Sequence, residues 1–370
     1  MAASRSALAH ELAPPTDAPV DPPTAQATLA AYHKDARLLV HTADLVNIET
    51  PPLLLDSLIT PLERFFVRNN RPSPSVASEA WQLTIDGLVR RPVTIDYAEL
   101  REMPVRSYHA VLECSGNSRK RFAAAGTPAE GVAWGDGAVG NGEWIGVAVA
   151  LLFERAGLKR GALQAECVSH GADPLVRGVE IRKLIEDGML AFAMNGEPLS
   201  AEHGGPVRLI VPGWGGINWV KWIAHMSIIS HESPGEFNQD RYVLYDSDGV
   251  ANGKVRELGV KSLITTLADG ATLPPGPHTI GGFAWSAARG VARVELSADG
   301  GASWAEAALG ADLGPRSWRA FSYTWQATPG QHTLAVRATD IEGAVQPLSV
   351  PFNKRGYLMN AVQQIAVQVG

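Results

Sequence analysis

The chain is poor in cysteine, with only Cys114 and Cys167 among its 370 residues. Two isolated cysteines are too few for a disulfide framework or a structural zinc site, and the sequence has no Cys-x-x-Cys-His segment for covalent haem attachment. Any metal-binding or catalytic role for sulfur therefore falls to one of two single thiols.

Long apolar runs and an excess of positive charge are also missing. No segment reaches the roughly 18 uninterrupted apolar residues of a membrane-spanning helix, and the start of the chain has neither the apolar centre nor the twin arginine of an export signal. The net charge of −6, without a polybasic run, gives no reason to expect nucleic-acid binding. We therefore predict a cytoplasmic protein that binds neither membrane nor nucleic acid.

Common catalytic signatures are absent as well. The sequence contains no Gly-x-Ser-x-Gly, His-Glu-x-x-His or Walker A segment, which argues against a serine hydrolase and a zinc protease. The glycine-dense loop at residues 134–144 is not a dinucleotide-binding fingerprint, because no strand leads directly into glycines that open a helix.

The sequence does contain enough apolar material for a large core, with 45% hydrophobic residues and a length that suggests two or three domains. Residues 1–37 begin rich in Ala, Pro and Thr and predict a flexible arm. Residues 38–245 mix strand and helix patterns, including a helix over residues 147–156 that Gly157 ends. Residues 246–370 contain short alternating strands, which predict an immunoglobulin-like β-sandwich. The expected fold class is therefore α+β, a mixed α/β domain followed by this sandwich.

The most unusual stretch surrounds Cys114. An apolar, strand-like run at residues 108–112 ends just before this cysteine, and a Ser-Gly-Asn-Ser turn and three cationic side chains follow it. Positive charge and loop N–H groups stabilise a thiolate, the form that binds metal or attacks a substrate. The alternative is a buried cysteine that acts as a small hydrophobe, which is our interpretation of Cys167 because it lies inside a strand pattern without flanking cations.

The first domain holds several other polar side chains that its strand and helix patterns do not require. They are Arg68, Arg119, Asp173, His203, Arg208 and Lys221. One thiol among many cations suggests an anionic cofactor or substrate, since the planar guanidinium of arginine can bind two oxygens at once. A cysteine-dependent hydrolase is the alternative, in which Cys114 would need His170 or His203 as a base oriented by Asp173.

Three motifs in this order resemble the sulfite oxidase family of molybdenum enzymes, in its bacterial, haem-free form. They are Phe66-Val67-Arg68-Asn69, then Glu113-Cys114-Ser115-Gly116-Asn117-Ser118-Arg119, then His203 to Arg208 with the following Pro212-Gly213-Trp214-Gly215 and Val220-Lys221-Trp222. The resemblance extends from about residue 38 to the C-terminus, and the sandwich is similar to the family's dimerisation domain.

The resemblance implies a molybdenum atom that is carried by one molybdopterin and bound by the thiolate of Cys114, a soft ligand suited to a redox-active transition metal. The other positions that match the family's cofactor-binding residues are Phe65, Phe66, Val67, Arg68, Asn69, Asp173, His203, Arg208, Trp219, Val220 and Lys221. The positions that match residues around the substrate oxyanion are Arg68, Arg119, Trp134, Tyr242 and Arg355. Asn70 stands where animal members of the family have histidine.

The implied activity is the oxidation of sulfite to sulfate at molybdenum, with electrons passed to a separate acceptor. Reduction of nitrate or of S- or N-oxides is the alternative within the same family. We expect no haem and a homodimer formed through the sandwich.

Overall fold

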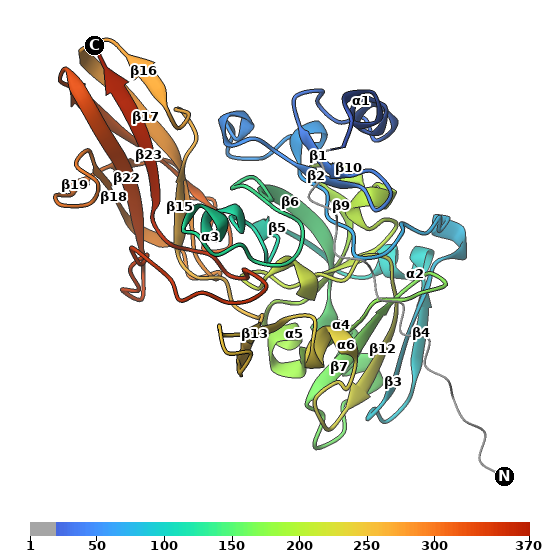
Figure 1. Ribbon diagram of the computed structural model, residues 1–370. Coiled ribbons are helices and arrows are strands. Elements are labelled where there is room, and N and C mark those ends of the chain that lie inside the picture. The colour runs from blue at the N-terminus through green and yellow to red at the C-terminus, as the bar shows by residue number, and fades with distance from the viewer. Residues whose placement is uncertain (1–19) are drawn as a thin grey trace.

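The computed structural model describes residues 20–370, which form two domains joined along a broad interface (Figure 1). The first domain contains one mixed and one antiparallel five-stranded sheet with short helices, and the second domain is built from strands alone. Among the described residues, no helix has the length and apolar character that crossing a membrane requires.

Order begins well before the predicted end of the arm. Helix α1 (Pro22–Ala31) starts at Asp21, whose side chain accepts a hydrogen bond from the backbone N–H of Thr24, and proline occupies its first turn. Leu29 of this helix is buried against the hairpin of β1 (Leu39–Thr42) and β2 (Asn47–Glu49). The prediction of a flexible arm is therefore wrong for residues 22–37, because a capped helix buries an apolar side chain there. Residues 1–19 lie outside the described part.

The first sheet of the first domain has five strands in the order β4-β3-β12-β7-β8. Its strands are β3 (Gln82–Gly87), β4 (Val93–Asp96), β7 (Gln164–Ser169), β8 (Val176–Glu180) and β12 (Ile223–Ile229). Strands β12 and β3 run parallel, whereas the other neighbours are antiparallel. Gly87 ends β3 with φ +80°, and a Cβ there would lie 2.3 Å from the carbonyl oxygen of Ile228, so this position requires glycine.

The second sheet places β5, β6 and β9 side by side, with β10 and β11 pairing with β9. Its strands are β5 (Val105–Glu113), β6 (Val139–Ala148), β9 (Met189–Met194), β10 (Glu197–Pro198) and β11 (Arg208–Ile210). The register pairs Glu113, the last residue of β5, with Val139 of β6. The two sheets share one apolar core that includes Trp81, Trp144 and Met226.

Short helices connect the strands of this domain. They are α2 (Tyr97–Glu102), α3 (Lys120–Ala124), α4 (Val149–Ala156), α5 (Ile181–Asp187) and α6 (Glu236–Gln239). The predicted helix over residues 147–156 is confirmed from residue 149 on as α4, which ends at Gly157 in the left-handed conformation, whereas residues 147 and 148 end β6. Helix α3 directly follows the Cys114 loop.

The second domain consists of two facing sheets that enclose their own apolar core, so the predicted β-sandwich is confirmed. One sheet contains β15 (Lys261–Ile264), β17 (Gly276–Trp285), β21 (Arg319–Ala327) and β20 (Ala308–Leu309). The other contains β16 (Ala271–Leu273), β23 (Gln363–Val369), β22 (Gly330–Asp340), β18 (Val291–Ser297) and β19 (Ala305–Glu306). The predicted boundary after residue 245 falls inside a hairpin of β13 (Val243–Tyr245) and β14 (Ala251–Lys254), and the sandwich itself begins at Lys261.

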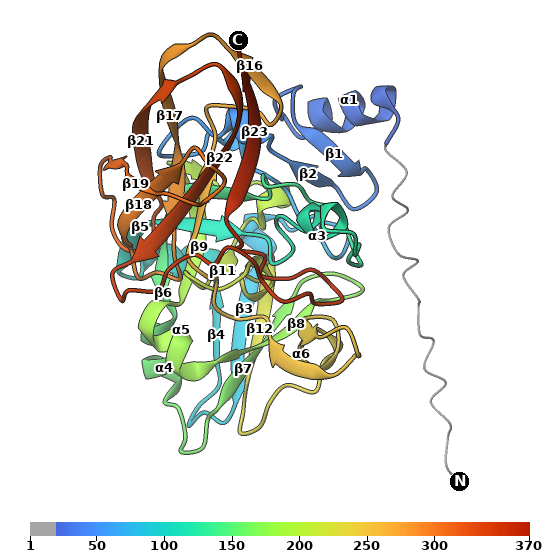
Figure 2. The ribbon, with the colours of Figure 1, turned by 60° about the vertical axis from the view of Figure 1, so that its left-hand side comes forward.

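The two domains share a buried interface near the Cys114 loop. Val111 and Val139 of the first domain pack with Phe283, Trp285 and other residues of the second. The segment between β22 and β23 also returns to the first domain, where it passes close to α3 and α6 (Figure 2). The sandwich therefore borders the region in which the sequence predicts the functional site.

Candidate active site

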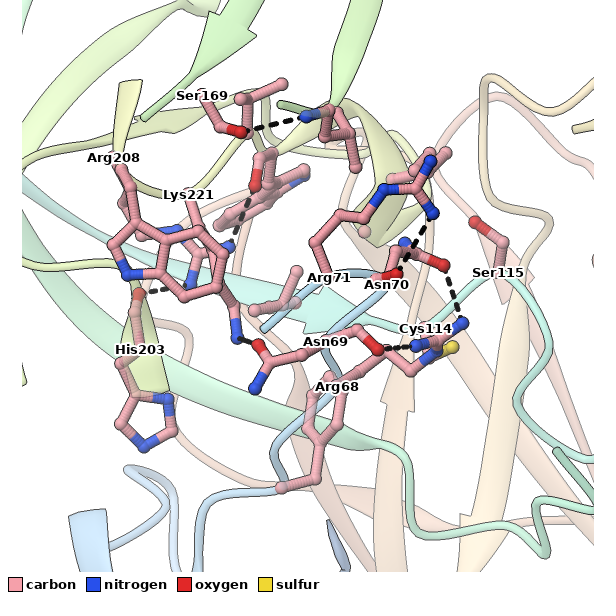
Figure 3. Close-up of a pocket in the computed structure, with 18 of the residues that line it drawn as sticks. Arg68, Asn69, Asn70, Arg71, Cys114, Ser115, Ser169, His203, Arg208 and Lys221 are labelled. Atoms are coloured by element: carbon pink, nitrogen blue, oxygen red, sulfur yellow. Dashed lines mark hydrogen bonds between the residues drawn. The ribbon is translucent and has the colours of Figure 1, made fainter. Parts of the chain in front are cut away.

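A cavity lies where loops from both sheets of the first domain meet, and it encloses about 710 Å³ of space including its open mouth. Ten of the predicted site residues line it. They are Phe66, Arg68, Asn69, Cys114, His203, Arg208, Trp219, Val220, Lys221 and Tyr242. In Figure 3, Cys114 and Arg68 lie at one end, and His203, Arg208 and Lys221 lie at the other.

Cys114 is held in the cavity wall by its backbone. Its N–H donates to the carbonyl of Ala138 at 2.9 Å, and its carbonyl accepts from the N–H of Asn117 at 2.9 Å, which closes a tight turn directly after β5. The side chain is half-buried and lines the cavity. Cys167, in contrast, is fully buried in β7, where burial raises the pKa of its thiol, so the prediction that it is a core residue is confirmed.

Arg68 approaches the same end of the cavity through a network of amides. Its guanidinium donates to Asn47 Oδ1 at 3.2 Å and to Asn70 Oδ1 at 2.6 Å, and also to the carbonyl of Asn69. Tyr242 donates from its hydroxyl to the same Asn70 oxygen at 3.2 Å. Asn70 therefore orients an arginine and a tyrosine that both line the cavity.

Buried cations dominate the opposite end. Arg208 donates to the carbonyls of His203 and Trp219 at 2.8 and 3.1 Å, and burial lowers its pKa to about 9. Lys221 donates to Asn69 Oδ1 at 2.6 Å and to the carbonyl of Glu202, and burial lowers its pKa well below 10.5. These hydrogen-bond partners are carbonyls and an amide, so neither cation is neutralised by direct contact with a carboxylate.

His203 is fixed by a lysine from the N-terminal segment. Lys34 places its ammonium 2.8 Å from His203 Nε2, and it also donates to the carbonyls of Leu62 and Phe65 at 2.7 and 3.2 Å. Burial, followed by the charges of Lys34, Lys221 and Arg208, lowers the pKa of His203 well below 6.5. Because an ammonium can only donate, the neutral imidazole accepts at Nε2 and carries its proton on Nδ1.

These residues fit an anionic cofactor that carries a metal. Desolvated cations favour a bound anion such as a phosphate group, and Arg208 Nε and Ser115 Oγ are buried polar atoms without a partner among the described residues. A single thiol faces the other end of the cavity, where it could bind a metal that the cofactor holds. Within residues 20–370, no three His, Cys, Asp or Glu side chains converge on a metal site of their own.

Six predicted site residues do not line the cavity. Phe65 and Val67 are buried in apolar clusters beside the cavity. They alternate with Phe66 and Arg68, which line it. Trp134 is buried with its ring centroid 4.8 Å from that of His41, so it is not the cavity wall that the resemblance implied. Asp173 is 71% exposed and forms an ion pair with Arg71 at 2.6 Å, so it reaches the cavity only through that arginine.

Arg119 and Arg355 form a connected pair behind the lining. Arg119 donates from Nε to the carbonyl of Arg355 at 2.8 Å and from Nη1 to the carbonyl of Val132 at 2.6 Å. Its guanidinium lies over the ring of Tyr357, and it is close enough to Cys114 for that residue to affect its pKa, which burial lowers. The Arg355 guanidinium pairs with Asp240 and does not line the cavity, so its contact with the oxyanion stays a prediction, and its backbone carbonyl holds Arg119.

The structure also brings into the cavity residues to which the sequence analysis assigned no role in the site. They are Asn70, Arg71, Leu112, Ser115, Ser169, Leu175, Gly216, Ile217 and Trp222. Arg71 could have been found, because it continues the polar run that begins at Arg68. Ser169 and Leu175 could not, since neither their residue type nor their spacing distinguishes them from ordinary strand and loop residues.

The residues of the alternative hydrolase do not form a catalytic triad. Asp173 pairs with Arg71, and His203 Nε2 accepts from Lys34. His170 has its Nε2 buried without a partner among the described residues. No carboxylate therefore orients either histidine as a base for Cys114.

Comparison with known proteins agrees with this geometry. The family described as "Oxidoreductase molybdopterin binding domain" matches residues 70–237, and the family described as "Mo-co oxidoreductase dimerisation domain" matches residues 253–370. The chain is therefore a molybdopterin-binding oxidoreductase with a dimerisation domain.

Individual relatives define the class further. The chain is 32% identical to sulfite oxidase of Gallus gallus, over 94% of this chain and 81% of that protein. It is 31% identical to nitrate reductase [NADH] of Solanum lycopersicum, over 87% of this chain but 40% of that protein. Among solved structures, the sulfane dehydrogenase SoxCD from Paracoccus pantotrophus superposes with a TM-score of 0.82 at 29% identity, covering 88% of this chain and 85% of that one.

The chain belongs to the sulfite oxidase family of molybdopterin enzymes. It spans about two thirds of the length of the mammalian sulfite oxidases that it matches.

Proposed function

We propose that this protein oxidises sulfite to sulfate at a molybdenum atom carried by one molybdopterin, and that it passes the electrons to a separate acceptor. The observation that carries this proposal is the division of one cavity into a thiol end, with Cys114 and Arg68, and an end of buried cations, with Arg208 and Lys221. Its relationship to sulfite oxidases supports the choice of sulfite.

The cation end would hold the anionic part of the cofactor. Arg208 is fully buried and Lys221 is half-buried, so each hydrogen bond from them to a phosphate oxygen would be stronger than at the surface. The neutral imidazole of His203 has its Nδ1–H available as a further donor, since Lys34 occupies Nε2. These three groups therefore bind and orient the cofactor rather than take part in the reaction.

The thiol end would hold the metal and the substrate. Molybdenum on molybdopterin would supply the oxygen-atom transfer and the accompanying two-electron change, which protein side chains cannot perform. Cys114 would bind the metal as a thiolate. Arg68, held by Asn47 and Asn70, would attract the sulfite oxyanion and keep it oriented. Tyr242 would keep Asn70 in place through the hydrogen bond that its hydroxyl donates.

A direct test uses protein expressed with ample molybdenum. We expect stoichiometric molybdenum and sulfite-dependent reduction of an artificial electron acceptor, and we expect Cys114→Ser to abolish that activity. If the protein contained molybdenum but did not oxidise sulfite, the proposed substrate would be wrong, whereas the proposed cofactor would stand.

Nitrate reduction is the second candidate, because the chain is related to a nitrate reductase and the cationic thiol end would attract nitrate as well as sulfite. Assays of the same preparation with nitrate and reduced methyl viologen, and with methionine sulfoxide, distinguish a reductase from a sulfite-oxidising enzyme.

Several further properties belong to the same proposal. We expect a homodimer formed through the second domain, which light scattering would test by mass, and an immunoglobulin-like strand connection within that domain. The absence of haem is tested by the absence of a Soret band in the purified protein. A cytoplasmic location stays a prediction that cell fractionation would test.

A further inference from the structure

A buried ion pair joins the second domain to the residue that precedes Cys114. Glu113 ends β5, and its Oε1 lies 2.7 Å from the Nζ of Lys261, the first residue of β15. The Lys261 side chain is 1% exposed and that of Glu113 is 6% exposed. Trp285 of β17 donates from its indole N–H to Glu113 Oε2 at 2.8 Å. Two side chains of the second domain therefore hold one carboxylate of the first.

The same lysine also holds the far end of the Cys114 loop. Lys261 Nζ donates to Ser118 Oγ at 2.8 Å, and Asn117 donates to Glu113 Oε1 at 2.9 Å. One ammonium thus connects the residue before Cys114 with the residue that follows the Ser-Gly-Asn turn. Figure 1 shows β15 at the border of the two domains, beside α3, the helix that continues this loop.

The remaining contacts of the loop come from the first domain. Asn117 Oδ1 accepts from the N–H of Ala138 at 2.9 Å, and the N–H of Cys114 donates to the carbonyl of the same alanine. The loop is therefore held from β6 on one side and from Lys261 on the other. Because burial without a partner is costly for either charge, Lys261 and Glu113 keep each other in place.

We propose that Lys261 is a positioning residue for the metal-binding thiolate, so that the second domain takes part in the metal site as well as in dimerisation. This proposal rests on the assignment of Cys114 as the molybdenum ligand. A residue that holds a metal ligand without touching the metal sets the orientation of that ligand and tunes the metal. Loss of such a residue typically lowers activity or metal affinity by about tenfold to a hundredfold. Lys261 meets that description, because it reaches the Cys114 loop through Glu113 and Ser118 and does not line the main cavity.

The test compares Lys261→Met with a matched variant that also breaks an ion pair between the domains. Arg316 of the second domain pairs with Asp187 of α5 at 2.5 Å, and neither residue touches the Cys114 loop or lines the main cavity. Arg316→Met is therefore the control for a weakened domain interface. Both variants are purified as holoenzymes, and molybdenum content, thermal unfolding, the thiolate-to-molybdenum absorption and the kinetics with sulfite are measured.

We expect Lys261→Met to shift the thiolate-to-molybdenum absorption and to lower kcat by about tenfold or more, with a smaller change in KM. Arg316→Met should leave both the absorption and kcat as in the wild type, whatever it does to thermal unfolding. An unshifted absorption in molybdenum-loaded Lys261→Met, or an equal shift in Arg316→Met, would overturn the proposal.

Glu113→Gln covers the case in which Lys261→Met does not fold, because it keeps the shape of the side chain and removes only the charge. We expect a smaller shift of the absorption in this variant, and an unchanged spectrum would contradict the proposal. Absence of molybdenum from the wild type would instead refute the proposed function. The spectral comparison does not depend on which substrate the wild type oxidises.

Discussion

Replacing Lys34 with methionine isolates the cost of burying the cation that supports His203. The ammonium is enclosed by His203 and the carbonyls of Leu62 and Phe65, and burial lowers its pKa from 10.5 to about 8. A difference of this size between the unfolded and folded proteins corresponds to about 3.4 kcal/mol. Burial of the charged Lys34 side chain therefore lowers the stability of the apoprotein at neutral pH by roughly this amount.

The direction of the pH dependence follows from the uptake of a proton by Lys34 on unfolding. Between pH 8 and pH 10.5 the unfolded chain binds a proton at Lys34 that the folded protein has released, so the contribution of Lys34 to stability rises with pH across this window. Below pH 8 both states are protonated and the full cost of burial is present. We expect the unfolding free energy of the wild-type apoprotein to rise between pH 7 and pH 10 by about 2.5 kcal/mol relative to Lys34→Met.

The assay is urea unfolding of the two apoproteins at pH 7 and pH 10, with Lys159→Met as a control because Lys159 is exposed. The control should follow the wild type at both pH values. Loading the cofactor should shrink the pH effect at Lys34, because a bound anion near the cluster favours the protonated ammonium. If the unfolding free energies of the wild type and of Lys34→Met changed by the same amount between pH 7 and pH 10, the desolvation argument would be refuted.

Three further predictions concern the substrate end and the rim. Arg119→Gln should raise KM for sulfite by about tenfold, because it removes a buried positive charge close to Cys114 that acts on the anion from behind the cavity lining. An unchanged KM would mean that Arg119 does not act on the anion. Gly356→Ala should also raise KM, because Gly356 has φ +58° and an added Cβ would lie 2.7 Å from Arg119 Cγ. Gly343→Ala is the control: Gly343 has φ +88° and open space around it, so this variant should have the KM of the wild type. Equal kinetics in these two glycine variants would argue against displacement of Arg119. Asp173→Asn should change stability by less than about 1 kcal/mol and leave molybdenum content intact, because the Asp173 side of its ion pair with Arg71 is exposed. Loss of molybdenum would restore Asp173 as a cofactor-binding residue.

Features that depend on neighbouring residues along the chain could be predicted from the sequence. The cysteine at the end of β5 and the glycine that ends α4 are both marked by adjacent residues, and the structure has them as predicted. The alternating pattern of the C-terminal strands likewise predicted a sandwich, because one face of each strand must be buried.

The sequence was insufficient where a side chain depends on distant partners. Nothing near Lys34 distinguishes it from a solvated lysine, yet it reaches His203, which lies 169 positions along the chain. The Arg119 side chain is held by a backbone carbonyl 236 positions away, that of Arg355, whose own side chain pairs with Asp240. Residue type alone could not reveal either contact. The role of Lys261 was missed for the same reason, since its carboxylate partner belongs to the other domain.

The central claim is that this cavity holds molybdenum on molybdopterin through Cys114, with the cation end binding the anionic part of the cofactor. Molybdenum per chain, measured by mass spectrometry on protein expressed with ample molybdate, tests it most directly. We expect one atom per chain in the wild type and a strongly reduced content in Lys221→Met combined with Arg208→Met, with Lys159→Met unchanged. Wild-type protein without molybdenum, or full molybdenum in the double variant, would contradict the account.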